Sequence, residues 1–119
     1  MTIKEKSIAF SNGEFEKIYD FIADNAVWTV VEEDTFTGKR AIIENCEQVG
    51  NYFKSVKTKF ETFNVISENR NVVVNGTAEF LKDNKRVSFV SACDLYEFND
   101  IGQIQKITSY CIQNGKMNR

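Results

Sequence analysis

The spacing of the apolar residues changes near Thr58 from the period of a helix to the period of a strand, and no other feature restricts the fold as much. Before this point, one apolar stripe runs along a predicted helix over 40–56 and consists of Ile42, Cys46, Val49, Phe53 and Val56. The intervals of four, three, four and three place these residues on one buried helix face. Beyond this point, alternation predicts four strands, over 59–67, 71–81, 86–98 and 104–113.

Turn-forming segments separate these strands and suggest how they pair. Lys82-Asp83-Asn84-Lys85 suits a tight hairpin turn, and Asn99-Asp100-Ile101-Gly102 suits a second one. The register that follows from the first turn puts Glu79 on the same face of the sheet as Asp94. Gly76 lies inside its predicted strand, which indicates a bulge that bends the sheet.

The N-terminal third carries helix signals. Two segments, Thr2-x-x-Glu5 and Ser11-x-x-Glu14, fit the capping box, in which a hydroxyl and a glutamate satisfy free N–H groups at the start of a helix. A helix is expected after each of them, and the second is expected to end at Asp24-Asn25. A short strand over 27–31 and a polar loop over 32–37 follow.

The predicted elements therefore come in the order helix, helix, strand, helix and four strands. This order is typical of an α+β fold, in which a curved antiparallel sheet packs its concave face on the N-terminal helices and on one long helix. The length of 119 residues suits a single core, so one domain over 1–119 is expected.

Composition excludes several classes of function. The formal net charge is −2 and the basic residues are scattered, so no nucleic-acid-binding face is expected. No apolar run approaches the roughly 18 residues of a membrane span, and the charged N-terminal segment predicts a cytoplasmic protein. The chain has no His, which excludes Ser-His and Cys-His nucleophiles. Its three cysteines are widely spaced, so neither a metal nor a cofactor is expected.

A carboxylate at position 94 interrupts the predicted strand over 86–98. Its near neighbours Ala92, Leu95 and Tyr96 are typical of a buried strand. A bare charge is costly to bury, so the Asp94 carboxylate must be solvated, paired or protonated. Groups of this kind occur mainly at pockets and interfaces, which makes Asp94 the candidate polar group of a cavity. The alternative is that Asp94 bonds a nearby hydroxyl or N–H group and only specifies the strand register.

The order of elements, together with particular residues, resembles the nuclear transport factor two-like superfamily and its SnoaL-like branch. Asp24 precedes the Trp-bearing strand, Gly38 opens the long helix, and the segment 93–98 runs into the segment 104–110. The resemblance covers nearly the whole chain. It implies a cone-shaped α+β barrel with a hydrophobic pocket between sheet and helices, and a homodimer formed through the outer face of the sheet.

The same resemblance tests enzymatic chemistry residue by residue. Asp94 matches the protonated, hydrogen-bond-donating aspartic acid of the ketosteroid isomerase members, which is one of the standard examples of a carboxylic acid kept neutral by an apolar site. The general base of those enzymes falls near Val30 and their oxyanion-hole tyrosine falls near Lys6, so two of three catalytic groups are absent. The cyclases and scytalone dehydratase also use His, which this chain lacks.

The resemblance and strand alternation together predict which residues line the pocket. Asp94 is the tentative catalytic residue. The predicted ligand-binding residues are Trp28, Val30, Ala92, Tyr96, Ile107, Ser109 and Cys111. Each has a plainer interpretation as core. Tyr96 is expected near the pocket rim or a dimer contact, and Tyr110 has the opposite parity and is expected on the outer face.

Three functions remain open at this point. The first is binding of a small apolar or aromatic molecule without developed catalysis. The second is an isomerase- or cyclase-type enzyme that transfers a proton on a hydrophobic carbonyl substrate, with Asp94 as acid or base. The third is a dimerisation module whose pocket is filled by side chains, and an open cavity of a few hundred Å³ beside Asp94 would exclude it.

Overall fold

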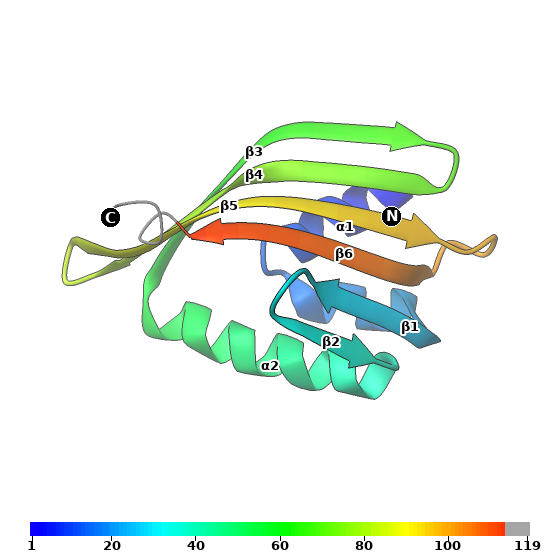
Figure 1. The fold of residues 1–119 in the computed structure, drawn as a ribbon, viewed down its shortest axis with the longest axis horizontal. Coiled ribbons are helices and arrows are strands. Elements are labelled where there is room, and N and C mark those ends of the chain that lie inside the picture. The colour runs from blue at the N-terminus through cyan, green and yellow to red at the C-terminus, as the bar shows by residue number, and fades with distance from the viewer. Residues whose placement is uncertain (114–119) are drawn as a thin grey trace.

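The protein consists of one six-stranded twisted sheet with helices packed on one of its faces, and the computed structural model describes residues 1–113 (Figure 1). In chain order the elements are α1 (Ile3–Ser11), the 3-10 helix η1 (Phe15–Phe21), β1 (Ile22–Val30), β2 (Asp34–Thr37), α2 (Lys39–Ser55), β3 (Lys57–Glu68), β4 (Asn71–Lys82), β5 (Lys85–Phe98) and β6 (Ile104–Gln113). The strands lie in the order β2-β1-β6-β5-β4-β3. The last six residues of the predicted domain, 114–119, lie outside the described part.

The long helix and the C-terminal strands agree closely with the prediction. β6 has the predicted bounds, and the ends of β3, β4 and β5 differ from theirs by at most two residues. The helix predicted over 40–56 is α2, and Gly38 occupies its N-cap. The α+β class is confirmed. The sheet is open and mixed, because β1 runs parallel to β6 while the other pairs are antiparallel.

The N-terminal third differs more from the prediction. The capping box at Thr2 is confirmed, since the Thr2 amide donates to Glu5 Oε1 at 2.7 Å and the Glu5 amide donates to Thr2 Oγ1 at 3.1 Å. The capping box at Ser11 is wrong, because Ser11 is the last residue of α1 and a short 3-10 helix follows. The helix end at Asp24-Asn25 is also wrong, because β1 already begins at Ile22. The predicted loop over 32–37 contains β2.

The core lies between the helices and one face of the sheet. Cross-strand pairing joins Trp28 of β1 to Ile107 of β6, Ile107 to Tyr96 of β5, and Tyr96 to Val72 of β4, and all four side chains are buried. Phe10 of α1 packs edge-on against Trp28 and Tyr96, with ring centroids 5.2 and 5.9 Å apart. Edge-to-face packing of large aromatic rings thus holds α1 on the sheet.

A bulge opposite Gly76 bends the sheet, as the sequence predicts. Thr62 pairs with Gly76 and Asn64 pairs with Asn75, so Phe63 is an extra residue of β3. A Cβ atom added to Gly76 would lie 2.2 Å from the carbonyl oxygen of Glu61. The two backbones can approach this closely only because position 76 has no side chain.

A second register shift, near the end of the β4–β5 hairpin, corrects the predicted place of Glu79. The turn itself is the predicted two-residue turn, but Phe80 pairs with Ser88 while Leu81 pairs with Arg86. The extra residue moves Glu79 to the face of the sheet opposite Asp94. There its carboxylate accepts hydrogen bonds from Nε and Nη2 of Arg86, at 2.8 and 2.6 Å.

Candidate functional site

A chain of polar groups centred on Asp94 crosses the otherwise apolar core. The hydroxyl of Ser11, at the end of α1, donates to Asp94 Oδ2 at 2.8 Å and lies 2.7 Å from the hydroxyl of Tyr96. A serine hydroxyl has one proton, so Tyr96 is the donor and Ser11 the acceptor in the second bond. The protons of both hydroxyl groups therefore point along the chain toward the carboxylate.

A second branch approaches Asp94 from the neighbouring strand. The indole Nε1 of Trp28 donates to Ser109 Oγ at 3.0 Å, and the bond is buried. Ser109 is the residue of β6 that pairs directly with Asp94. An indole N–H can only donate, so the Ser109 hydroxyl keeps its own proton free for the carboxylate beside it. Asp94 is thus the acceptor on which both branches converge.

Burial dominates the protonation behaviour of these groups. Removal from water raises the pKa of the Asp94 carboxyl above its ordinary value, and hydrogen bonds from Ser109 and Ser11 oppose this rise without cancelling it. Burial, followed by the nearby Asp94 carboxylate, raises the pKa of Tyr96 well above its usual range. Tyr96 therefore remains a neutral donor, and Asp94 is the titrating group of the cluster.

The strand register places every residue of the predicted pocket on the face that carries Asp94. Val30 and Ser109 lie in the row of Asp94. Trp28, Ile107 and Tyr96 form the next row. Ala92 pairs with Cys111 on the other side. Two details differ from the expectation: Tyr96 is fully buried rather than near a rim, and Cys111 is exposed near the strand end.

The space beside Asp94 is small. A cavity of about 40 Å³ borders the carboxylate, and Ser11, Asn12, Phe60 and Gly76 are among its lining residues. This volume has room for a water molecule but is well below the roughly 300–1,000 Å³ of ordinary ligand pockets. Packed aromatic side chains fill most of the interior in which the resemblance implies a hydrophobic pocket.

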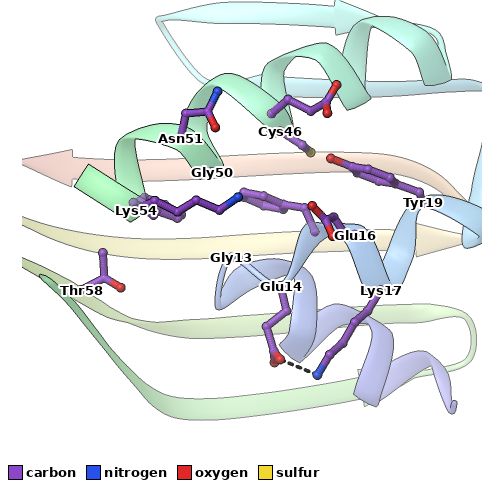
Figure 2. Close-up of a pocket in the computed structure, with 13 residues that line it drawn as sticks. Gly13, Glu14, Glu16, Lys17, Tyr19, Cys46, Gly50, Asn51, Lys54 and Thr58 are labelled. Atoms are coloured by element: carbon purple, nitrogen blue, oxygen red, sulfur yellow. Dashed lines mark hydrogen bonds and ion pairs between the residues drawn. The ribbon is translucent and has the colours of Figure 1, made fainter. Parts of the chain in front are cut away.

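A larger opening lies nearby, between η1 and α2 (Figure 2). This cleft measures about 540 Å³, and its residues are Gly13, Glu14, Phe15, Glu16, Lys17, Tyr19, Cys46, Glu47, Gly50, Asn51, Phe53, Lys54 and Thr58. Phe15, Phe53 and Cys46 supply apolar surface, and charged side chains from both helices surround it. Burial raises the pKa of the Cys46 thiol to about 12, so Cys46 presents a neutral thiol rather than a nucleophile.

Sequence reasoning missed two parts of this arrangement. Ser11 was assigned to a helix start, although the structure uses its hydroxyl to bridge Asp94 and Tyr96. The cleft was missed because its walls come from two helices whose facing sides cannot be paired from periodicity. The available signals were Cys46 and Phe53, which lie on the predicted buried stripe of the long helix.

Within residues 1–113, no three His, Cys, Asp or Glu side chains gather in a way that could hold a metal ion. In the same part of the chain, no helix is both long enough and apolar enough to cross a membrane.

Comparison with known proteins agrees with the fold. The model of the SnoaL-like domain family matches residues 7–107. No curated protein matches the chain by sequence. An NTF2-like protein of unknown function from Cytophaga hutchinsonii has 29% identity and a TM-score of 0.82, over 91% of this chain and 94% of its own.

More distant structures share the architecture. An LEH-like epoxide hydrolase from M. tuberculosis superimposes with a TM-score of 0.65 and 17% identity, over 87% of this chain and 74% of its own. A protein from Kribbella flavida, provisionally described as a ketosteroid isomerase, gives a TM-score of 0.71 and 12% identity, over 92% of this chain and 75% of its own. At these identities the likeness concerns the fold.

Proposed function

Because the chain belongs to the SnoaL-like domain family, we propose that it binds a small apolar or aromatic molecule whose polar group meets Asp94. The observation that supports this most is a buried, titratable carboxyl in an apolar interior, bordering a cavity. A carboxyl that only specified strand register would not need space beside it. A few polar groups converging in an apolar site are typical of ligand pockets.

Binding without catalysis accounts for the site better than proton transfer does. Tyr96 reaches Asp94 through Ser11, but its raised pKa keeps the hydroxyl protonated, so Tyr96 cannot accept a proton as a general base. Val30 occupies the position at which the isomerase resemblance requires a general base, and its side chain cannot carry a proton. Among the described residues of the cluster, Asp94 is therefore the one acidic group whose proton is available for exchange, and no second group completes a proton-transfer pair.

The proposal is tested through the Asp94 carboxyl signal. We expect carboxyl-detected NMR, with Asp94→Asn to assign the signal, to give a pKa above the ordinary value of about 3.9. Small ketones and phenols that bind should shift this signal. Carboxylic acids should leave the signal unchanged, because their carboxylates are repelled by the ionised Asp94 carboxylate. A normal pKa together with no response to any apolar hydroxyl or carbonyl compound would exclude the proposed site.

The same pKa shift has a consequence for stability whose sign can be checked independently. A raised folded-state pKa means that the native state holds the Asp94 proton more tightly than the unfolded chain does. The resulting stabilisation is complete below the unfolded-state pKa and is lost as the pH rises through the folded-state pKa. Urea unfolding at several pH values should therefore show that the free energy of unfolding of the wild type falls relative to that of Asp94→Asn as the pH rises through this window.

The proposal includes assembly with a second copy of the chain through the outer face of the sheet. The outward side chains in the middle of β5 and β6 include Cys93, Leu95, Thr108 and Tyr110, the last of which is 52% exposed, and Glu97 pairs with Lys106 at the end of the same face. Light scattering is expected to give the mass of a dimer. Tyr110→Glu should give a monomer, because it would bury a charge in the interface, whereas Ile101→Glu, in the exposed turn before β6, should leave the dimer intact.

A further inference from the structure

The cleft between η1 and α2 is a second space in the molecule, because no residue lines both this cleft and the cavity beside Asp94. Its volume of about 540 Å³ lies within the roughly 300–1,000 Å³ of small-molecule sites. Phe15 and Phe53 supply much of its apolar surface, and their rings stack with centroids 6.1 Å apart at 23°. A flat ring of a ligand can pack against this aromatic surface.

Gly50, in the middle of α2, keeps this cleft open. Its backbone is helical, so its conformation does not require glycine, and an added Cβ atom would meet nothing closer than the Phe15 ring at 4.0 Å. A glycine inside a helix is less favourable than an alanine. Position 50 therefore weakens α2 without any close packing to explain it, and what it leaves is free space beside Phe15.

Five charged side chains line the cleft, and two of them neutralise each other. Lys17 Nζ donates to Glu14 Oε2 at 2.5 Å, which pairs these two charges (Figure 2). The other three are Glu16, Glu47 and Lys54, and they form no ion pair with any residue of the segment 1–113. Two carboxylates and one ammonium group therefore remain to meet a ligand.

The two carboxylates lie near Tyr19, away from Lys54. Removal from water contributes most to raising the pKa of Tyr19, and repulsion from Cys46, Glu47 and Glu16 raises it further. Lys54 follows Glu47 by seven residues on α2, which at about 1.5 Å per residue is roughly 10 Å along the helix. Figure 2 shows Lys54 and Tyr19 at opposite ends of the cleft. The cleft thus has an acidic end and a basic end.

We propose that this cleft binds an aromatic amine, with its ring against Phe15 and Phe53 and its protonated nitrogen near the carboxylates of Glu16 and Glu47. The Lys54 ammonium group repels the nitrogen and so fixes the direction in which the ligand lies. The ring of Tyr19 offers a further attraction to a cation at the acidic end. This second site takes a cation and does not depend on the function proposed above.

The test compares three probes of similar shape and different charge: 2-phenylethylamine, 2-phenylethanol and 3-phenylpropionate. Binding is followed at neutral pH through the carboxyl signals of Glu16 and Glu47, which Glu16→Gln and Glu47→Gln assign. We expect the amine to bind about three- to tenfold more tightly than the alcohol, the scale of two exposed charge pairs. The propionate should bind more weakly than both. In about 1 M NaCl, which screens exposed charges, the advantage of the amine should nearly disappear.

Two variants test the acidic end and the open space separately. Glu47→Gln should weaken binding of the amine about three- to fivefold and leave that of the alcohol unchanged, and Glu68→Gln, at the exposed end of β3, is its control. Gly50→Leu fills the space beside Phe15 and should abolish binding of both probes. Its control is Gln48→Leu, which adds the same side chain to an exposed position of α2 outside the cleft and should bind as the wild type does.

Several results would overturn the proposal. Equal affinity for the amine and the alcohol at low salt would show that the carboxylates do not select a cation. No response of the Glu16 and Glu47 signals to the amine, with or without a shift of the Asp94 signal, would show that the cleft is not its site. Undiminished binding by Gly50→Leu, shown to be folded by its unfolding curve, would have the same meaning. None of these results bears on the ketone and phenol titration, which tests the proposed function separately.

Discussion

Gly76→Ala is expected to destabilise the protein more than any other single methyl addition. The new Cβ atom would lie 2.2 Å from the Glu61 carbonyl oxygen and 3.1 Å from the Thr62 Cα atom, and all of these atoms belong to backbones held by strand pairing. Neither strand can retreat without losing ladder hydrogen bonds or the bulge at Phe63. We expect the free energy of unfolding to fall by about 4 kcal/mol or more, a large part of the roughly 5–15 kcal/mol of a typical domain.

The measurement is a urea unfolding curve followed by the fluorescence of Trp28, the single tryptophan. Gly50→Ala is the matched control, because a Cβ atom there meets nothing closer than 4.0 Å, at the Phe15 ring. Gly50 lies within α2, where alanine is favoured over glycine by about 0.5–1 kcal/mol, so this variant should unfold at a higher urea concentration than the wild type. Equal unfolding midpoints for Gly76→Ala and the wild type would show that the strands are not held as described.

Tyr96→Ala is expected to have the second largest effect on stability. The Tyr96 side chain is fully buried between β6 and β4, and its ring packs against Phe10. Truncation of a buried aromatic ring leaves a cavity and typically costs about 3–5 kcal/mol. Phe10 would lose a neighbour as well, which loosens α1 from the sheet.

Tyr96→Phe separates the ring from its hydroxyl. It removes the bond to Ser11 but leaves Ser11 free to donate to Asp94, so no donor is orphaned and a cost of about 1 kcal/mol is expected. Chemical unfolding of both variants measures how much each substitution lowers the free energy of unfolding. If Tyr96→Phe cost as much as Tyr96→Ala, the hydroxyl network rather than ring packing would hold this part of the core.

The parts of the fold that were predicted correctly are those that depend on local patterns. β6 was predicted to the residue because its alternation is bounded by a turn at Gly102. α2 was predicted to within one residue at each end because one apolar stripe follows Gly38. The face shared by Trp28, Asp94 and Ser109 also follows from alternation once the strands are paired.

The parts that were missed depend on contacts between distant segments. Ser11 fits a helix start locally, but a carboxyl 83 positions away in sequence uses its hydroxyl instead. One extra residue near Val87 reversed the face of Glu79, because a shift by one turns a strand over. The volume beside Asp94 depends on how aromatic rings such as Phe60 pack in the interior, and this packing cannot be predicted from the sequence pattern.

The place of β1 between β2 and β6 has a consequence for how the chain is made. β1 is the first strand of the described part and β6 is the last, yet they are neighbours in the sheet. During synthesis, β1 can pair with β2 soon after it emerges, but its other edge stays open until β6 has been translated. A nascent chain therefore carries an unpaired strand edge from the synthesis of β1 until that of β6, which favours association with other chains and slows folding.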